Sequence, residues 1–310
     1  MSEEPRSAEE SGPGDAPPRS GLKFSPIPFT IIALAGIFIL YQGVGGALTL
    51  LLFGGGVTRE TVTGIRAATM LSQLLFLLVP TLLLMKFQHG SVSGAMPFRM
   101  PKAAETLLVV LCVVSLQQAL EGYLFFQDMI PLPPELERML ETVKRMIEET
   151  MKLLGEAHSA PELLFVLLVV AVTPAVCEEL FFRGLIQKNL IAASNTRTGI
   201  IATGLIFGIY HFNPFLLVPL SALGIFFSYV RSRSNTLVLP IAAHFVNNAV
   251  STAGFFWQQD RASASFLLEG ASADVPPGYV LGVMAVSAVV FALCLYSYRV
   301  VTQDVAQHSH

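Results

Sequence analysis

Three apolar segments of the sequence carry ionisable or amide side chains where a membrane helix usually carries leucine. The first reads Cys-Glu-Glu-Leu-Phe-Phe-Arg over residues 177–183, the second ends in His211, and the third runs from His244 to Asn248. A charged side chain at the centre of a bilayer costs ~2.5–3.5 kcal/mol on insertion scales, so such residues are rare and mark functional sites. Together these polar residues predict an active site inside the membrane.

The composition indicates a protein that crosses the membrane several times. Of its 310 residues, 53% are hydrophobic and only 13% are charged, whereas soluble domains carry roughly 25% charged residues. The mean hydropathy is +0.62. The net charge of −3 and the lack of a basic cluster argue against a nucleic-acid partner.

Eight segments are long and apolar enough to predict helices that cross the bilayer, since a crossing helix needs about 20 such residues. Residues 135–156 instead alternate charged and apolar side chains with the period of an amphipathic helix, which we expect at the membrane surface or as a cap on the bundle. The expected fold class is therefore all-α, a polytopic membrane helix bundle with about eight transmembrane helices and one amphipathic interfacial helix. The eight segments are about 27–53, 64–87, 104–127, 161–187, 199–213, 215–231, 237–257 and 277–300.

Polar tails flank the transmembrane domain, which we expect to cover residues 26–301. Residues 1–25 are rich in Ser, Glu, Pro and Gly and predict a disordered tail, and residues 302–310 predict a short C-terminal tail. Lysines and arginines near helix ends mark the cytoplasmic side, which predicts both termini in the cytoplasm. The short loops favour a multi-pass protein of a bacterial cytoplasmic membrane. The basic residues assigned to the cytoplasmic side are Lys23, Lys86, Arg99, Lys102, Lys188, Arg197, Arg231, Arg233 and Arg299.

This topology places the polar groups of the three segments at similar depth. Counting from the cytoplasmic helix ends puts Glu178, His211 and His244 roughly 15, 18 and 10 Å into the bilayer. Three titratable groups that converge from separate helices mark a site. We expect that site to open toward the cytoplasm.

The spacing within each segment assigns roles. Glu179 and Arg183 are four residues apart and share a helix face, which predicts a mutual ion pair that makes a buried arginine tolerable. Glu178 lies about 100° around the helix and has no local cation, so it is free to act as a general base. His244 and Asn248 are also four apart and present one face to the bundle.

Two prolines precede key residues by four positions. Pro174 precedes Glu178, and Pro240 precedes His244. Either proline is able to kink its helix and release a backbone carbonyl near the site, and Pro240 has the alternative of simply beginning its helix. Asn247 points to another face, and we expect it to be structural.

The three segments resemble the motifs of the CPBP family, which comprises the type II CAAX prenyl endopeptidases and the bacterial Abi proteins. The family pattern is Glu-Glu-x-x-x-Arg, then Phe-x-x-x-His, then His-x-x-x-Asn. This sequence has all three in that order within about 161–257, which we take as the catalytic core. The matching residues are Glu178, Glu179 and Arg183, then Phe207 and His211, then His244 and Asn248.

The resemblance implies an intramembrane endopeptidase that hydrolyses peptide bonds of membrane-associated peptides or proteins within the lipid bilayer. It implies that Glu178, assisted by His211, activates a water, while His244 and Asn248 stabilise the oxyanion and Glu179 and Arg183 support them. Metal-free glutamate chemistry without a cofactor is the expectation. Zinc held by Glu178, His211 and His244 stays open, although the sequence lacks HExxH.

Two other classes of function remain as alternatives. Buried glutamate and histidine also build proton relays in transporters, but such proteins are commonly built from two related halves, and no internal repeat is evident. A non-catalytic bacteriocin-immunity protein or scaffold is the second alternative. For a protease, the substrate stays open between a prenylated C-terminal peptide, a bacteriocin leader and another membrane-associated peptide.

Overall fold

The computed structural model describes residues 22–96, 98–258 and 275–303. These ranges are helical and contain no β-strand, which confirms the expected all-α class. Most of the tail predicted for residues 1–25, and of that predicted for 302–310, lies outside the described residues. The elements are α1 (Pro26–Phe38), η1 (Ile39–Gly45), α2 (Gly46–Phe53), α3 (Val62–Ser72), η2 (Gln73–Leu78), α4 (Val79–His89), α5 (Val92–Ala95), α6 (Ala103–Asp128), α7 (Pro134–Gly155), α8 (Ala160–Leu167), η3 (Leu168–Val172), α9 (Thr173–Glu179), η4 (Leu180–Ile186), α10 (Gln187–Ala193), α11 (Thr196–Tyr210), η5 (Pro214–Leu216), α12 (Leu217–Ser234), α13 (Val238–Gln258) and α14 (Pro277–Val301).

The long helices form where the hydropathy predicted them. Segments η1 to η4 are π-helical and continue their neighbouring α-helices, so that α8, η3, α9, η4 and α10 form one rod. Two of the eight predicted segments, about 199–213 and 237–257, form α11 and α13. Helix α11 has only 15 residues, about 22 Å of length, and ends at Tyr210 where the prediction ran to residue 213. Six helices of the described ranges are long and apolar enough to cross a membrane: Pro26–Phe53, Val62–His89, Ala103–Asp128, Ala160–Ala193, Pro214–Ser234 and Pro277–Val301.

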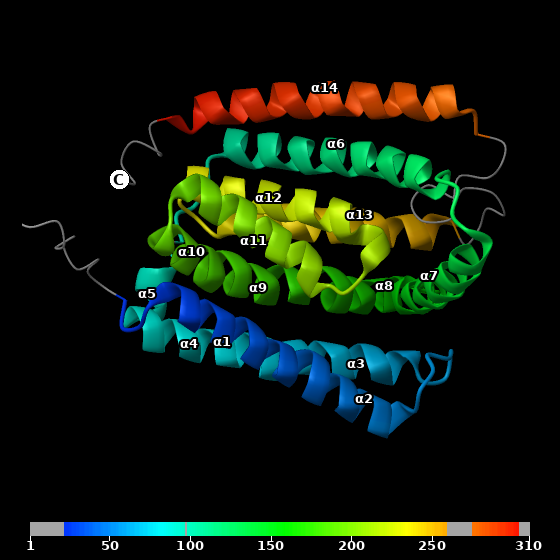
Figure 1. The fold of residues 1–310 in the computed structure, drawn as a ribbon, viewed down its shortest axis with the longest axis horizontal. Coiled ribbons are helices and arrows are strands. Elements are labelled where there is room, and N and C mark those ends of the chain that lie inside the picture. Colours follow the sequence, from blue (N-terminus) through cyan, green and yellow to red (C-terminus); the bar gives the residue numbers. More distant parts are fainter. Residues whose placement is uncertain (1–21, 97, 259–274, 304–310) are drawn as a thin grey trace, which may run out of the picture.

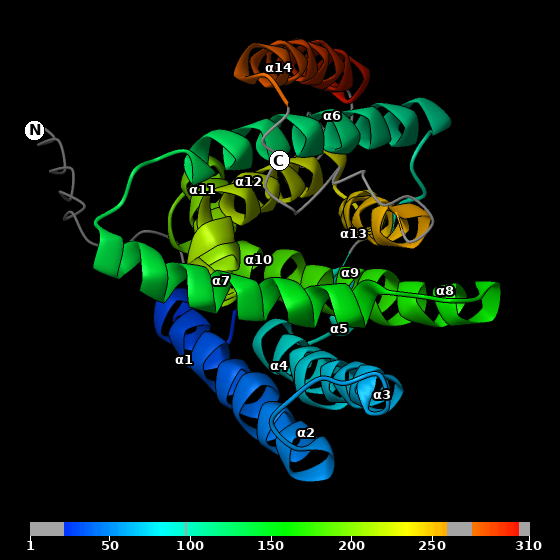
Figure 2. The same cartoon turned by 90° about the vertical axis from the view of Figure 1, so that its right-hand side faces the viewer.

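Figure 1 shows these helices in layers, with the α8–α10 rod in the middle. Helices α1 to α4 pack on one side of the rod and α11 to α13 on the other, while α6 and α14 form the outermost layer (Figures 1 and 2). Helix α9 contacts η2 on one side and α13 on the other. The predicted site residues lie on the rod and on α11 and α13, so the fold places them inside the bundle.

The amphipathic segment forms α7, which lies across one end of the bundle (Figure 2). A buried arginine from α3 holds its C-terminal end. Arg66 donates to the carbonyl oxygens of Leu154, Leu153 and Glu156, the first two at 3.0 and 2.8 Å. It also forms an ion pair with Glu162 at 2.9 Å. Because the last carbonyls of a helix lack helical partners, this guanidinium both caps α7 and joins it to α3 and α8.

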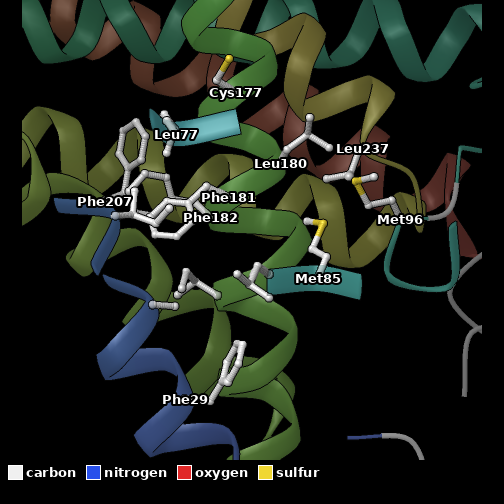
Figure 3. Packing of buried hydrophobic residues seen from close by; sticks show 14 residues of the cluster. Phe29, Leu77, Met85, Met96, Cys177, Leu180, Phe181, Phe182, Phe207 and Leu237 are labelled. Carbon is white, nitrogen blue, oxygen red and sulfur yellow. The ribbon is translucent and has the colours of Figure 1, made fainter. Parts of the chain in front are cut away.

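An aromatic cluster packs behind the first polar motif (Figure 3). Phe181 and Phe182 come from η4 and Phe207 from α11, and all three are buried. The ring centres of Phe182 and Phe207 are 5.1 Å apart in an edge-to-face arrangement, a geometry that aromatic rings favour. Phe212 and Phe245 are instead exposed on the outside of the bundle. The cluster joins α11 to the rod and so positions the end of α11.

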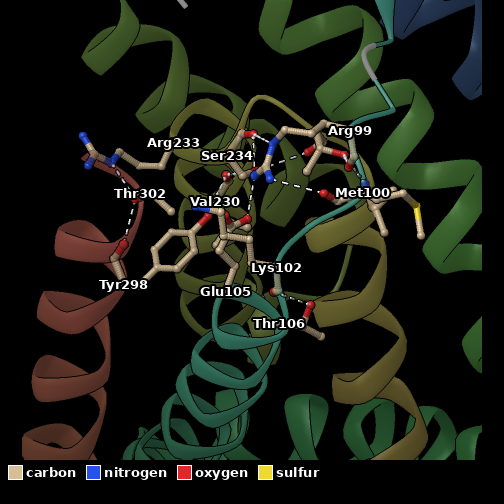
Figure 4. Close-up of polar contacts among 12 residues, drawn as sticks. Arg99, Met100, Lys102, Glu105, Thr106, Val230, Arg233, Ser234, Tyr298 and Thr302 are labelled. Atoms are coloured by element: carbon tan, nitrogen blue, oxygen red, sulfur yellow. Dashed lines mark hydrogen bonds and ion pairs between the residues drawn. The ribbon is translucent and has the colours of Figure 1, made fainter. Parts of the chain in front are cut away.

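A polar clamp at the other end of the bundle positions the start of α13 (Figure 4). Arg99 forms an ion pair with the buried Glu105 at 2.5 Å and donates to the carbonyl of Ser234 at 3.2 Å. The Thr236 hydroxyl donates to the carbonyl of Arg99 at 2.7 Å and accepts from the N–H of Val238 at 3.2 Å. These bonds hold the α12–α13 turn against the start of α6.

Candidate active site

Glu178 and His211 approach each other from different helices. Glu178 lies at the end of α9, and His211 caps the C-terminus of α11. Glu178 Oε2 is 3.7 Å from His211 Nε2, which is too long for a direct hydrogen bond. The two side chains are 15% and 29% exposed, whereas Glu179 is fully buried. Only one carboxylate of the Glu-Glu pair is therefore accessible.

The end of α11 determines which nitrogen of His211 carries a proton. Its Nδ1 lies 2.7 Å from the carbonyl oxygen of Phe207, one of the last carbonyls of the helix, which lack helical partners. A carbonyl oxygen only accepts, so Nδ1 donates and the Nε2 of the neutral ring is left as an acceptor. The chain then reverses through Phe212, whose φ is 50°. The helix end thus presents a hydrogen-bond acceptor to Glu178.

The second carboxylate, Glu179, binds two basic side chains. Arg183 Nη1 and His244 Nδ1 each lie 2.8 Å from Glu179 Oε1, and all three side chains are at most 5% exposed. The ion pair expected from the four-residue spacing is present. The expectation of a pair confined to Glu179 and Arg183 was incomplete, because α13 packs against α9 and brings His244 to the same oxygen.

Aromatic rings enclose these basic groups. The guanidinium carbon of Arg183 is 4.7 Å from the ring centre of Phe207 and 5.3 Å from that of Phe227. Phe227 also stacks on the His244 ring, with 5.3 Å between ring centres and 20° between planes. Arg183 Nη2 donates to the carbonyl of Gly224 at 2.9 Å. Ring faces attract cations, so this enclosure holds the guanidinium and the imidazole in place and keeps them dry.

Asn248 binds a backbone carbonyl that Pro174 releases. Proline has no N–H, so the carbonyl of Val170, four residues earlier, lacks its helical donor, and the rod widens there into η3. Asn248 Nδ2 donates to this oxygen at 3.0 Å and Asn247 Nδ2 donates to Asn248 Oδ1 at 3.1 Å. One of the two amide hydrogens of Asn248 is used in this way. Pro240 lies in the first turn of α13, as a helix-starting proline does.

The structure brings the predicted residues together as two neighbouring pairs. Glu178 faces His211, His244 contacts Glu179, and the Phe207 ring lies 4.5 and 5.9 Å from the two imidazole ring centres. Among the residues that the structure describes, no three His, Cys, Asp or Glu side chains are grouped closely enough to hold a metal ion. A zinc site formed by Glu178, His211 and His244 does not fit this arrangement, and we derive no step through a metal.

Sequence reasoning missed polar residues elsewhere in the bundle. Gln117 and Glu121 on α6 each have a buried oxygen without a hydrogen-bond partner, and Arg66 on α3 is fully buried. All three lie within predicted spans, about 64–87 and 104–127. The signal that revealed Glu178, a polar side chain at membrane depth, would have revealed these residues as well.

Comparison with known protein families finds a match over the region that holds the candidate site. The family model for type II CAAX prenyl endopeptidase Rce1-like proteins matches residues 160–250. This range contains the predicted Glu178, His211, His244 and Asn248. No match was found among curated proteins or among solved structures. The family match confirms the resemblance seen in the motifs: residues 160–250 match the CAAX-type intramembrane endopeptidases of the CPBP family.

Proposed function

We propose that this protein hydrolyses a peptide bond of a membrane-associated peptide or protein with a water that Glu178 and His211 activate. The observation that carries the proposal is the approach of two acceptors, Glu178 Oε2 and His211 Nε2, to 3.7 Å. The same carboxylate oxygen is buried without a hydrogen-bond partner. A water between the two groups donates one hydrogen to each, which leaves its lone pairs directed at a substrate carbonyl.

Glu178 is both the base and the acid of the proposed reaction. Its carboxylate takes a proton as the water oxygen bonds to the scissile carbonyl carbon. When the C–N bond breaks, the carboxyl group gives that proton to the leaving amine, and the carboxylate is restored. His211, held by the Phe207 carbonyl, orients the water throughout.

His244 and Asn248 supply hydrogen bonds to the oxyanion. Asn248 has a second amide hydrogen, and His244 donates from Nε2 when its ring carries both protons. Glu179 Oε1 accepts from Nδ1 and so fixes the direction in which Nε2 points. Each such donor stabilises the transition state by ~2.7–4 kcal/mol.

The proposed reaction uses no metal ion. Glu178 Oε2 and His211 Nε2 lie 3.7 Å apart, and within the described residues no three His, Cys, Asp or Glu side chains are grouped to hold a metal ion. We expect purified protein to keep its full peptidase activity after exhaustive chelation. Activity that disappears with chelation and returns only with added zinc would contradict this part of the proposal.

We also propose that both termini lie in the cytoplasm of a bacterial cell. The two described ends of the chain lie at the same end of the bundle (Figure 1). Arg99, Arg233 and Arg299 lie near this end (Figure 4), and α7 covers the opposite end. An excess of basic residues marks the cytoplasmic side. Labelling of single cysteines placed at residue 22 and within α7, in intact cells, tests this orientation.

The reaction is tested by comparing the membrane peptides of cells that produce the wild type or Glu178→Gln. Mass spectrometry should find product peptides that only the wild type generates, because the amide cannot accept the proton. Glu149→Gln, an exposed change on α7, is the matched control and should generate the wild-type peptides. Identical peptides from the wild type and Glu178→Gln would reject the protease and favour a scaffold.

A further inference from the structure

A row of polar side chains leads away from the catalytic residues between α6 and α13. Asn247 donates to Asn248 Oδ1 at 3.1 Å, and the Ser251 hydroxyl donates to the carbonyl of Asn247 at 3.1 Å. Gln117 Nε2 on α6 donates to Ser251 Oγ at 3.0 Å. Polar side chains of this kind hydrogen-bond neighbouring membrane helices to each other. We call Asn247, Ser251, Gln117 and Glu121 the α6–α13 row.

Glu121 ends this row. It lies four residues after Gln117, on the same face of α6, inside a membrane-spanning helix. Gln118 Nε2 donates to Glu121 Oε2 at 3.1 Å, which fixes the carboxylate. Among the described residues no lysine, arginine or histidine forms an ion pair with Glu121. An ionisable residue in a membrane helix marks a functional site unless a partner neutralises it.

The unsatisfied atoms of the row are all acceptors. Gln117 Oε1, Asn247 Oδ1 and Glu121 Oε1 are buried and have no hydrogen-bond partner. Buried polar atoms without partners are uncommon and need an explanation, such as a functional role. A ligand that supplies N–H donors and a positive charge complements three acceptors, one of them a carboxylate. A peptide backbone that carries a basic side chain has this chemistry.

We propose that the α6–α13 row is a substrate subsite in which peptide N–H groups meet Gln117 and Asn247 and a lysine or arginine side chain pairs with Glu121. This inference rests on the proposed endopeptidase function. It gives the enzyme a preference for a basic residue at a fixed distance from the cleaved bond.

The geometry gives that distance. Helices α6 and α13 both run toward the α7 end of the bundle (Figure 1), so their axial offsets add. From Asn248 to Ser251 and from Gln117 to Glu121 the rise totals about 10 Å. An extended peptide covers that length with about three residues. The basic residue should therefore lie about three positions from the cleaved bond.

The test compares membrane peptides from cells that produce the wild type, Glu178→Gln, Glu121→Gln and Gln118→Ala. Products that Glu178→Gln abolishes define the substrates. These should carry lysine or arginine about three positions from the cleaved bond. Glu121→Gln should lower their cleavage at least about tenfold, while rarer substrates that are neutral at this position remain unchanged. Gln118→Ala, which keeps the charge, should lower cleavage of the same basic substrates less.

Two results would overturn the inference while leaving the protease intact. The first is a set of products without a basic position, or an equal loss for basic and neutral substrates in Glu121→Gln. The second is an Arg261→Gln variant that reproduces the Glu121→Gln effect, because the carboxylate would then pair with an arginine of the chain itself. If Glu178→Gln abolishes no product, the proposed function fails first. Charge reversal, Glu121→Lys with a substrate changed from lysine to glutamate, should restore cleavage.

Discussion

Glu179→Gln tests the buried bridge between α9 and α13. The change keeps the size of the side chain and removes its charge. Arg183 and His244 both donate to Glu179 Oε1 at 2.8 Å, and Arg183 is fully buried. Without the carboxylate, the buried guanidinium loses the charged group to which it donates. Removing one partner of a buried ion pair costs ~3–5 kcal/mol, so we expect the free energy of unfolding to fall by this amount.

The same change should slow the reaction by a separate route. His244 loses the carboxylate that holds its ring through Nδ1, and with it the fixed orientation of the Nε2–H that stabilises the oxyanion. Loss of one oxyanion donor lowers turnover about 10²–10³-fold. Unfolding in detergent micelles and peptide cleavage at saturating substrate, measured on one preparation, report the two effects separately.

Glu141→Gln on α7 is the matched control. Glu141 and Arg145 have the same four-residue spacing as the buried pair, but they are 63% and 66% exposed and 3.4 Å apart. An exposed helical pair contributes ~0.3–0.5 kcal/mol, and activity should not change. If Glu179→Gln destabilises the protein no more than Glu141→Gln, the buried guanidinium does not depend on the carboxylate and the reasoning is wrong.

Two further predictions concern the contacts that the rod makes with α13 and α3. Asn248→Ala should cost ~0.6–1.7 kcal/mol, because the Val170 carbonyl loses its donor. Added to Asn248→Ala, Pro174→Ala should restore that stability, since an N–H returns to the helix, but it should not restore cleavage. Strictly additive losses of stability in the double variant would contradict this. Arg66→Met should cost ~3–5 kcal/mol and expose α7 to limited proteolysis, because Glu162 and the α7 carbonyls lose their partner. Proteolysis at the wild-type rate would show that Arg66 does not hold α7.

Much of the fold could be predicted because hydropathy acts locally. A run of apolar residues long enough to span a bilayer must form a helix, since only a helix satisfies every backbone group without water. The amphipathic period of α7 is likewise visible in consecutive residues. The prediction placed the end of α11 too late, because His211 and Phe212 have apolar neighbours in the sequence. The helix ends where the chain reverses through a positive φ at Phe212.

The candidate site could be predicted as a set of residues but not as a set of contacts. Spacing along one helix revealed that Glu179 and Arg183 meet. It could not reveal that His244 joins them, because that contact spans 65 residues and depends on how α13 packs on α9. Gln117 was missed for a similar reason, since its partner Ser251 lies 134 residues away.

From the sequence alone we could infer an all-helical membrane protein that resembles the CPBP family, with Glu178, His211, His244 and Asn248 as candidate catalytic residues. The cost of a polar side chain in the membrane and the periodicity of apolar residues are properties of one segment, so both can be predicted from the sequence. The packing of the helices was needed to show which carboxylate is accessible and which is buried, and that Asn248 meets the carbonyl released by a proline. Those outcomes depend on the relative rotation and depth of separately packed helices, which side-chain packing and buried hydrogen bonds set together.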